Sequence, residues 1–188
     1  MVVRARRVQG KSGDTVVKLR PLAPDELREK LRLSSSLTVE VDAMPGGYVC
    51  SASLKGKADA KAIREATSGT TPLRGLFSKE QRRFLEAHVP DGVGWGELTV
   101  LGPIFVLKLN MSPADLGRRL VVELWFYPDG SRILELSTKC TAKNAFQVAA
   151  ESRAFLVSRG INLDGKQQTK TKAALTFFSK ELRAAGEA

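Results

Sequence analysis

The sequence RRLVVELWFYPDGSRILELSTKC, residues 118–140, decides the predicted fold. Apolar and polar residues alternate on both sides of Pro128-Asp129-Gly130, and a period of two is typical of strands with one apolar and one polar face. Proline, aspartate and glycine are common turn residues, so the two halves are expected to pair as an antiparallel hairpin. The polar positions of this pattern are Glu123, Glu135, Ser137 and Lys139.

Similar alternation predicts further strands in the rest of the chain. Two of them are joined by the polar loop QGKSGD and form a second hairpin. The segment MPGG at 44–47 predicts a turn between the next two, and Gly102-Pro103 interrupts the last, because proline lacks an amide donor. The expected strands cover residues 2–8, 15–20, 37–42, 48–56 and 98–109.

Helical signals lie between and after these strands. Ser78 followed by Gln81 is a capping-box signature that opens a helix through about His88. A helix that starts at Thr141 or Lys143 is expected to end at Ser158, before Gly160, because glycine suits a left-handed terminus. The other expected helices are Asp25 to about Leu33, 59–67 and 169–184. Together these elements predict a single α+β domain, residues 1–188, with a mainly antiparallel sheet and surrounding helices.

The composition favours anionic partners. Thirty Lys and Arg against twenty Asp and Glu give a net charge of +10, which suits phosphates, nucleic acid or an acidic membrane surface. Nucleic acid is the weaker expectation, since aromatic residues for base stacking make up only 6%. Cys50 and Cys140 have no zinc-type spacing, and no apolar run reaches the length of a bilayer span or a signal peptide. We therefore expect a cytoplasmic protein with reduced thiols and no membrane partner.

Charges of both signs occupy the alternating positions. Cations dominate the early strands and carboxylates the later ones, which suggests a sheet wrapped around a charged interior that suits a polyanion and its metal ions. Trp125 shares the parity of Glu123 and would lie on the same face. The alternative is an ordinary solvated outer face of a sheet.

Four stretches, in this order, resemble the CYTH superfamily, the triphosphate tunnel enzymes that include thiamine triphosphatases, inorganic triphosphatases and one class of adenylate cyclase. They are VVRARR with TVVKLRP, LTVEVDAMPGGYVCSASLKG, LFSKEQRRFLE with VLGPIFVLKL, and VVELWFYPDGSRILELSTKC with AFQVAAESRAFL and QQTKTKAAL. The resemblance implies an eight-stranded antiparallel β tunnel or barrel. Its basic wall binds a triphosphate, and its acidic residues hold Mg²⁺ or Mn²⁺.

The resemblance also suggests which residues would line such a tunnel. The expected phosphate ligands are Arg4, Arg6, Lys18, Arg20, Lys108, Lys139, Lys170 and Lys172, and the expected metal ligands are Glu40, Asp42, Glu123 and Glu135. Arginine and lysine neutralise a triphosphate, whereas carboxylates beside them repel it unless a metal bridges the two. No residue is assigned a catalytic role. Lys170 and Lys172 can equally be solubilising residues at a helix start.

Two departures from the family pattern leave two function classes open. The family's first strand carries Glu-x-Glu-x-Lys, which this chain lacks, and Ser137 stands where a second acid is usual. Strand-like alternation begins at Val2, so the chain is expected to open inside the fold, through a misplaced gene start or as a natural short form. Another chain could fill the open sheet edge. The classes are a metal-dependent triphosphatase, with cyclase-like activity less favoured, and a non-catalytic binder of polyphosphate, nucleotides or nucleic acid.

Overall fold

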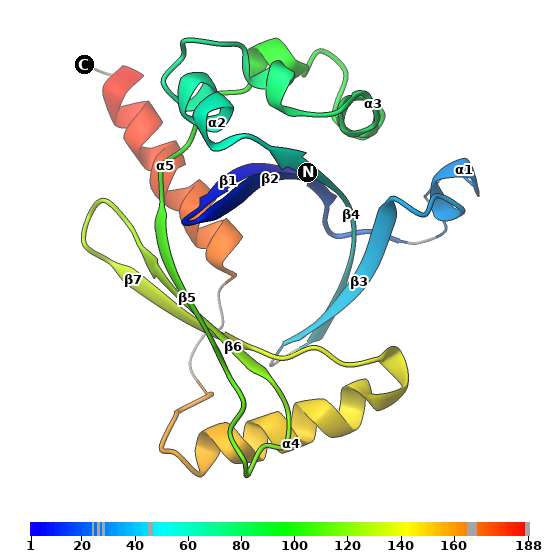
Figure 1. Cartoon of the computed structure of the whole chain (residues 1–188), viewed down its shortest axis with the longest axis vertical. Coiled ribbons are helices and arrows are strands. Elements are labelled where there is room, and N and C mark those ends of the chain that lie inside the picture. Colours follow the sequence, from blue (N-terminus) through cyan, green and yellow to red (C-terminus); the bar gives the residue numbers. More distant parts are fainter. Residues whose placement is uncertain (24, 26, 28, 45–46, 165–168, 187–188) are drawn as a thin grey trace. The chain divides into compact units, whose positions relative to one another are not determined.

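The computed structural model describes residues 1–23, 25, 27, 29–44, 47–164 and 169–186 (Figure 1). The chain forms two compact units, Met1–Asp42 with Gly46–Val100, and Ala43–Pro45 with Leu101–Ala188. Each unit combines an antiparallel sheet with helices, so the predicted α+β class is confirmed. Among the described residues the strands pair into two separate sheets, of four and three strands, and closure into an eight-stranded tunnel stays a prediction.

The first unit contains a sheet in the order β1-β2-β4-β3. Its strands are β1 (Val2–Val8), β2 (Lys11–Leu19), β3 (Leu37–Met44) and β4 (Gly47–Ala58). The β1–β2 hairpin is confirmed, although β2 starts at Lys11 rather than Thr15 because only Gln9 and Gly10 form the turn. The polar residues of KSGD, 11–14, predicted a loop, but all four belong to β2. Gly13 lies at a position of this strand where a side chain would not fit. A Cβ there would lie 2.6 Å from the Arg6 carbonyl oxygen and from Ile63 Cδ1.

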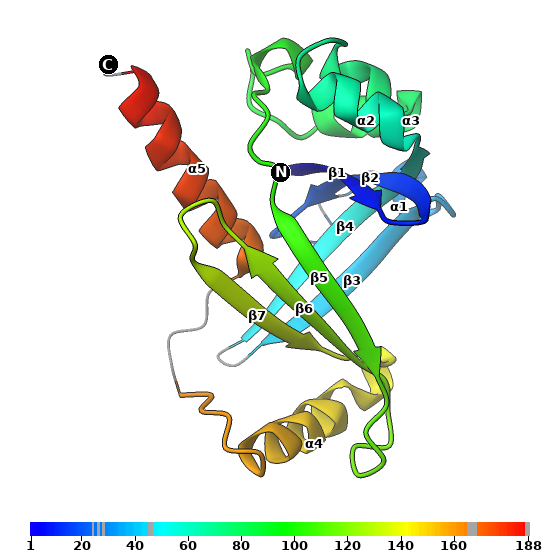
Figure 2. The same cartoon turned by 60° about the vertical axis from the view of Figure 1, so that its left-hand side comes forward.

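Helices α2 (Ala60–Thr67) and α3 (Lys79–Glu86) cover one face of this sheet (Figure 2). Both begin at side-chain caps: Asp59 accepts hydrogen bonds from two α2 amides, and Ser78 and Gln81 form the predicted capping box of α3. Helix α1 spans Glu29–Arg32, and residues 26 and 28 of the helix predicted from Asp25 lie outside the described residues. The 3₁₀ helices Leu73–Leu76 and Trp95–Glu97 complete the unit. The predicted MPGG turn includes residues 45 and 46, which lie outside the described residues.

The core of the first unit lies between this sheet face and α3. Val17 and Leu54 from the sheet pack with Phe84 and Leu85 from the helix. Gln81 is buried among them, and its Nε2 donates hydrogen bonds to the carbonyl oxygens of Thr15 at 3.3 Å and Leu54 at 3.1 Å. Since side chains alternate along a strand, burying this face directs the intervening residues to the opposite face.

The second unit contains a sheet in the order β5-β6-β7, with β5 (Phe105–Met111), β6 (Leu120–Phe126) and β7 (Arg132–Ser137). The hairpin predicted from residues 118–140 is confirmed. The prediction of a strand from residue 98 is wrong for residues 98–104, and pairing begins only after Pro103, which has no amide hydrogen to donate to a ladder.

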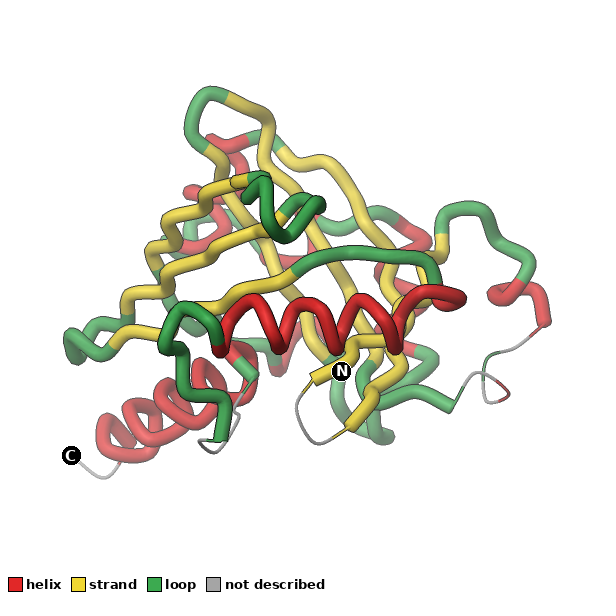
Figure 3. The backbone as a smooth tube through the Cα atoms, turned by 90° about the horizontal axis from the view of Figure 1, so that it is seen from below, coloured by secondary structure: helices red, strands yellow, loops and turns green. Residues whose placement is uncertain are grey.

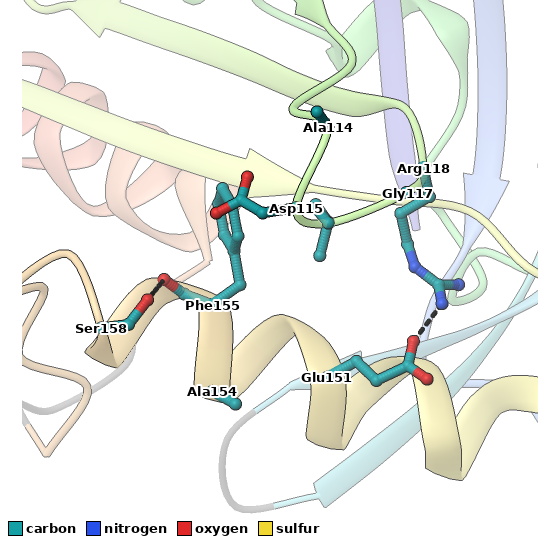
Figure 4. A pocket seen from close by; sticks show the side chains of 9 residues that line it. Ala114, Asp115, Gly117, Arg118, Glu151, Ala154, Phe155 and Ser158 are labelled. Atoms are coloured by element: carbon teal, nitrogen blue, oxygen red, sulfur yellow. Dashed lines mark hydrogen bonds and ion pairs between the residues drawn. The ribbon is translucent and has the colours of Figure 1, made fainter.

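Two helices accompany this sheet, α4 (Ala145–Val157) and α5 (Lys170–Gly186). Helix α4 runs beside the loop that joins β5 and β6 (Figure 3), and the Arg118–Glu151 ion pair connects them. Figure 4 shows Arg118 directed toward Glu151 in the groove between the loop and α4, which measures about 660 Å³. The helix ends before Gly160, whose φ of 72° confirms the predicted left-handed terminus.

Candidate functional site

The face of the first unit's sheet opposite α2 and α3 collects basic side chains from three strands. Residues directly opposite each other in an antiparallel pair share a face. Arg4 faces Val16, which faces Lys55, and in the next row Arg6 faces Asp14, which faces Lys57. Lys18 faces Ser53. This set, Arg4, Arg6, Lys18, Lys55 and Lys57, together with Arg20 just after β2, is called the basic face below.

An aspartate holds two cations of the basic face. Asp42 on β3 lies 3.6 Å from Lys18 Nζ and 3.3 Å from Arg20 Nη1, both distances measured to its Oδ2 atom. Strand β4 lies between β2 and β3, so these ion pairs extend across it. Ser51 and Ser53 of β4 are buried, and their short side chains leave room for the longer ones. Asp42 therefore fixes the positions of Lys18 and Arg20 over the sheet.

Three residues of this region were not among the predicted site residues. They are Asp14, which pairs with Arg6, and two cations of the basic face, Lys55 and Lys57. Arg6 donates through Nε and Nη2 to Asp14 Oδ2, at 2.9 and 2.5 Å, so part of its charge is neutralised. Lys55 and Lys57 are exposed. They continue the alternation of Ser51 and Ser53 along β4, and that period of two was the signal that could have identified them. Glu40, at an alternating position of β3 with Asp42, is half-buried.

A second charged cluster lies in the second unit. Lys108, Glu123 and Glu135 are directly opposite one another on β5, β6 and β7. Lys108 Nζ lies 2.8 Å from Glu123 Oε1. Lys170, at the start of α5, places its Nζ 2.5 Å from Glu123 Oε2 and 2.6 Å from Glu135 Oε1. The structure thus brings together four of the predicted site residues from distant parts of the chain.

Trp125 lies on the same face of the sheet as this cluster, as its parity predicted. Its Nε1 donates a hydrogen bond to Glu123 Oε2 at 3.3 Å, and Lys170 Nζ lies 4.9 Å from the centre of its ring. An ammonium near the face of an indole ring is stabilised by the ring quadrupole. Trp125 therefore contacts both members of the Lys170–Glu123 ion pair.

The pKa of Glu123 is strongly lowered. Burial, which leaves the residue 8% exposed, raises the pKa, but hydrogen bonds from Lys108 and Lys170 outweigh it and bring the pKa from 4.5 to about 2. Glu123 is consequently a carboxylate at neutral and mildly acidic pH.

This shift predicts acid sensitivity of the fold. Because the folded-state pKa of Glu123 is depressed, its stabilisation is fully present above pH 4.5 and is lost as the pH falls toward 2. We expect the free energy of unfolding to fall by on the order of 3 kcal/mol over that range through this group alone. Urea titrations across the range should show a shallower pH slope for Glu123→Gln. Exposed Glu181 provides the control, and a Glu181→Gln slope as shallow as that of Glu123→Gln would contradict the assignment.

Two further predicted phosphate ligands, Lys139 and Lys172, lie near the end of β7 and on α5. Lys139 follows the end of β7 and is exposed, and Lys172 is exposed on α5. Residues two apart on a helix do not face the same direction, so Lys172 does not accompany Lys170 toward Glu123.

The predicted metal ligands form two pairs, one in each unit, and neither pair fits a divalent ion as arranged. Asp42 is engaged by Lys18 and Arg20, and the ammonium of Lys170 lies between Glu123 and Glu135. No group of three or more His, Cys, Asp or Glu suited to a metal ion occurs in the part of the chain that the structure describes. Binding of Mg²⁺ or Mn²⁺ stays a prediction of the CYTH resemblance.

Other expectations concern the cysteines and membranes. Cys50 is half-buried and Cys140 is exposed, and the structure describes both as free cysteines. Across the described ranges, every helix is too short or too polar to span a bilayer.

The comparisons with known proteins found no relative of this chain. A scan against models of protein families, a search of curated proteins and a search of solved structures each returned no match. The resemblance to the CYTH superfamily therefore rests on the sequence stretches quoted above.

Proposed function

We propose that the protein binds a triphosphate or longer polyphosphate on the basic face of the first unit. The observation that carries this proposal is the gathering of cations from β1, β2 and β4 on the sheet face opposite α2 and α3. A linear polyphosphate carries about one negative charge on each phosphate, so a row of cations on adjacent strands can neutralise it.

The local geometry supports anion binding in two ways. Arg20 and Arg4 can each donate paired hydrogen bonds to phosphate oxygens, a geometry that lysine lacks. Asp42 holds Lys18 and Arg20 in place before a ligand arrives, which reduces the side-chain entropy lost on binding. An eight-stranded tunnel around the ligand is the arrangement that the CYTH resemblance implies, and it belongs to this proposal.

Metal-dependent hydrolysis of the bound triphosphate is the second candidate. Asp42 favours it, because its carboxylate lies on the strand next to β4, 3.6 Å from Lys18 and 3.3 Å from Arg20 of the basic face. Glu40 occupies an alternating position of the same strand. Asp42 would have to exchange those cations for a metal ion before it could take this role.

Replacing Asp42 distinguishes metal-free binding from metal-dependent hydrolysis, because each predicts a different result for the variant. If binding is metal-free, Asp42→Asn removes a negative charge beside the phosphates, while its side-chain oxygen can still accept hydrogen bonds from Lys18 and Arg20. We therefore expect tripolyphosphate affinity to rise ~3–10-fold. If Asp42 holds a catalytic metal, the same variant instead abolishes Mg²⁺-dependent phosphate release. Calorimetry in EDTA and phosphate-release assays in Mg²⁺ or Mn²⁺ measure the two effects. Asp91→Asn, at an exposed loop position of the same unit, is the matched control.

The binding experiment itself tests the proposed function. Tripolyphosphate titrated into the full chain in EDTA should bind with an affinity that falls as salt is raised, since cations release counterions on contact with a polyanion. A single-stranded oligonucleotide of equal charge should bind more weakly. Absence of tripolyphosphate binding at low salt would refute the proposal, and tighter oligonucleotide binding would favour the nucleic-acid alternative.

A further inference from the structure

The ammonium of Lys170 lies where a metal ion would bridge two carboxylates. Its Nζ atom is 2.5 Å from Glu123 Oε2 and 2.6 Å from Glu135 Oε1, on neighbouring strands that place the two glutamates directly opposite each other. Oxygen ligands surround Ca²⁺ at about 2.3–2.6 Å and Mg²⁺ at about 2.0–2.1 Å. A divalent ion and this ammonium therefore cannot occupy the gap between the carboxylates together.

Several contacts hold Lys170 in this position. Its side chain is 21% exposed, and the ring of Trp125 lies on one side of the ammonium. Its backbone carbonyl accepts a hydrogen bond from the Tyr127 hydroxyl at 3.1 Å, which attaches the first turn of α5 to the end of β6. The Tyr127 ring also contacts the ring of Phe177, with 5.9 Å between centroids. Lys170 is thus fixed both through its backbone and through its side chain.

The charge balance of the Lys108, Glu123, Glu135 and Lys170 cluster also disfavours a bound divalent ion. Glu123 and Glu135 carry two negative charges, and Lys108 and Lys170 carry two positive charges, so the cluster is neutral. Both oxygens of Glu123 already accept hydrogen bonds, one from Lys108 and the other from Lys170 and Trp125. A divalent ion added to this cluster would bring two uncompensated charges to a carboxylate that is 8% exposed, which is unfavourable.

We propose that Lys170 is a built-in cation that replaces a divalent metal ion between Glu123 and Glu135. The second unit then holds its acidic pair together without metal, and α5 is anchored to the sheet by the same contact. Removing the ammonium leaves two carboxylates with one cation, Lys108, and so creates a site that accepts a divalent ion. This inference rests on the second unit alone and is independent of phosphate binding on the basic face.

Manganese binding to the full chain tests the proposal. Electron paramagnetic resonance of free Mn²⁺ measures how much ion the protein removes from solution. We expect Lys170→Met, which keeps most of the aliphatic stem, to bind Mn²⁺ at least ~10-fold more tightly than the unsubstituted protein. The gain should disappear when Glu135→Gln is added. Lys172→Met is the matched control, because Lys172 is exposed two residues along the same helix.

Two results would overturn the proposal. One is a Lys170→Met variant with an unchanged circular dichroism spectrum and no gain in Mn²⁺ affinity. The other is Mn²⁺ binding by the unsubstituted protein that Glu135→Gln removes, since the ion would then displace the ammonium. A measurement on the unsubstituted protein remains decisive even if the variants do not fold. The ¹⁵Nζ resonance of Lys170 should keep its width when Mn²⁺ is added, and selective broadening of that resonance would contradict the proposal.

Discussion

Alanine at both Lys18 and Arg20 is expected to weaken tripolyphosphate binding by at least ~100-fold. Each side chain would lose a charge-assisted hydrogen bond to phosphate, worth about 1.5–3 kcal/mol, and 1.4 kcal/mol corresponds to tenfold in affinity. Both residues are about one-fifth exposed and held by Asp42, so they lie on the sheet rather than extend into solvent. Calorimetry in EDTA measures the affinity, and repeating it at several salt concentrations measures how many ionic contacts are lost.

The control for this variant has to remove the same charge elsewhere in the same unit. Lys79 and Arg83 are exposed on α3, which packs on the other face of the sheet. Alanine at both also lowers the net charge by two, and we expect it to change the affinity less than ~3-fold, through the long-range field alone. Equal losses for the two double variants would show that net charge, rather than the basic face, determines binding.

Gln81→Ala is expected to lower the free energy of unfolding of the first unit by about 3–5 kcal/mol. Gln81 is 2% exposed, and its Nε2 donates to the carbonyl oxygens of Thr15 and Leu54. Its Oε1 accepts hydrogen bonds from the backbone amide of Ser78 at 3.0 Å and from Thr15 Oγ1 at 3.2 Å. Alanine leaves these buried groups unpaired, removes half of the capping box and opens a cavity, three effects that act in the same direction.

Urea unfolding followed by circular dichroism measures the change. Arg83→Ala is the comparison, since Arg83 is exposed on the same helix, and a surface substitution of this kind usually changes stability by less than about 0.5 kcal/mol. A loss below about 1 kcal/mol for Gln81→Ala would mean that water replaces the amide without difficulty. The predicted role of Gln81 in joining α3 to β2 and β4 would then be wrong.

Local signals in the sequence were sufficient for much of the fold. Ser78 and Gln81 predicted the start of α3 because a capping box needs only residues three positions apart. Turn residues 128–130 predicted the β6–β7 hairpin, and its short loop places Glu123 opposite Glu135. The alternation of apolar and polar residues wrongly predicted a strand at residues 98–104. Pro103 in this segment has no amide hydrogen to donate to a neighbouring strand.

The composition of the charged clusters depended on contacts between distant segments. The sequence suggested that Glu123 and Glu135 bind metal, but it could not show that Lys170 reaches both of them from the start of α5. Lys108 and Glu123 are opposite one another only through the β5–β6 register, which is set across a loop of eight residues, 112–119. In the same way, β4 adds Lys55 and Lys57 to the basic face by pairing with β2.

The sequence by itself determined most of the strands, the capping box of α3 and which side chains share a face within each strand, because period and capping act over a few neighbouring residues. Only the tertiary structure decided which faces meet and which charge neutralises which. Sheet order, register and the docking of α5 arise from the burial of residues far apart in the chain, such as Val17 with Phe84, and Tyr127 with Phe177. For that reason only the structure could show that a lysine of the same chain lies between the two glutamates for which the sequence predicted a metal ion.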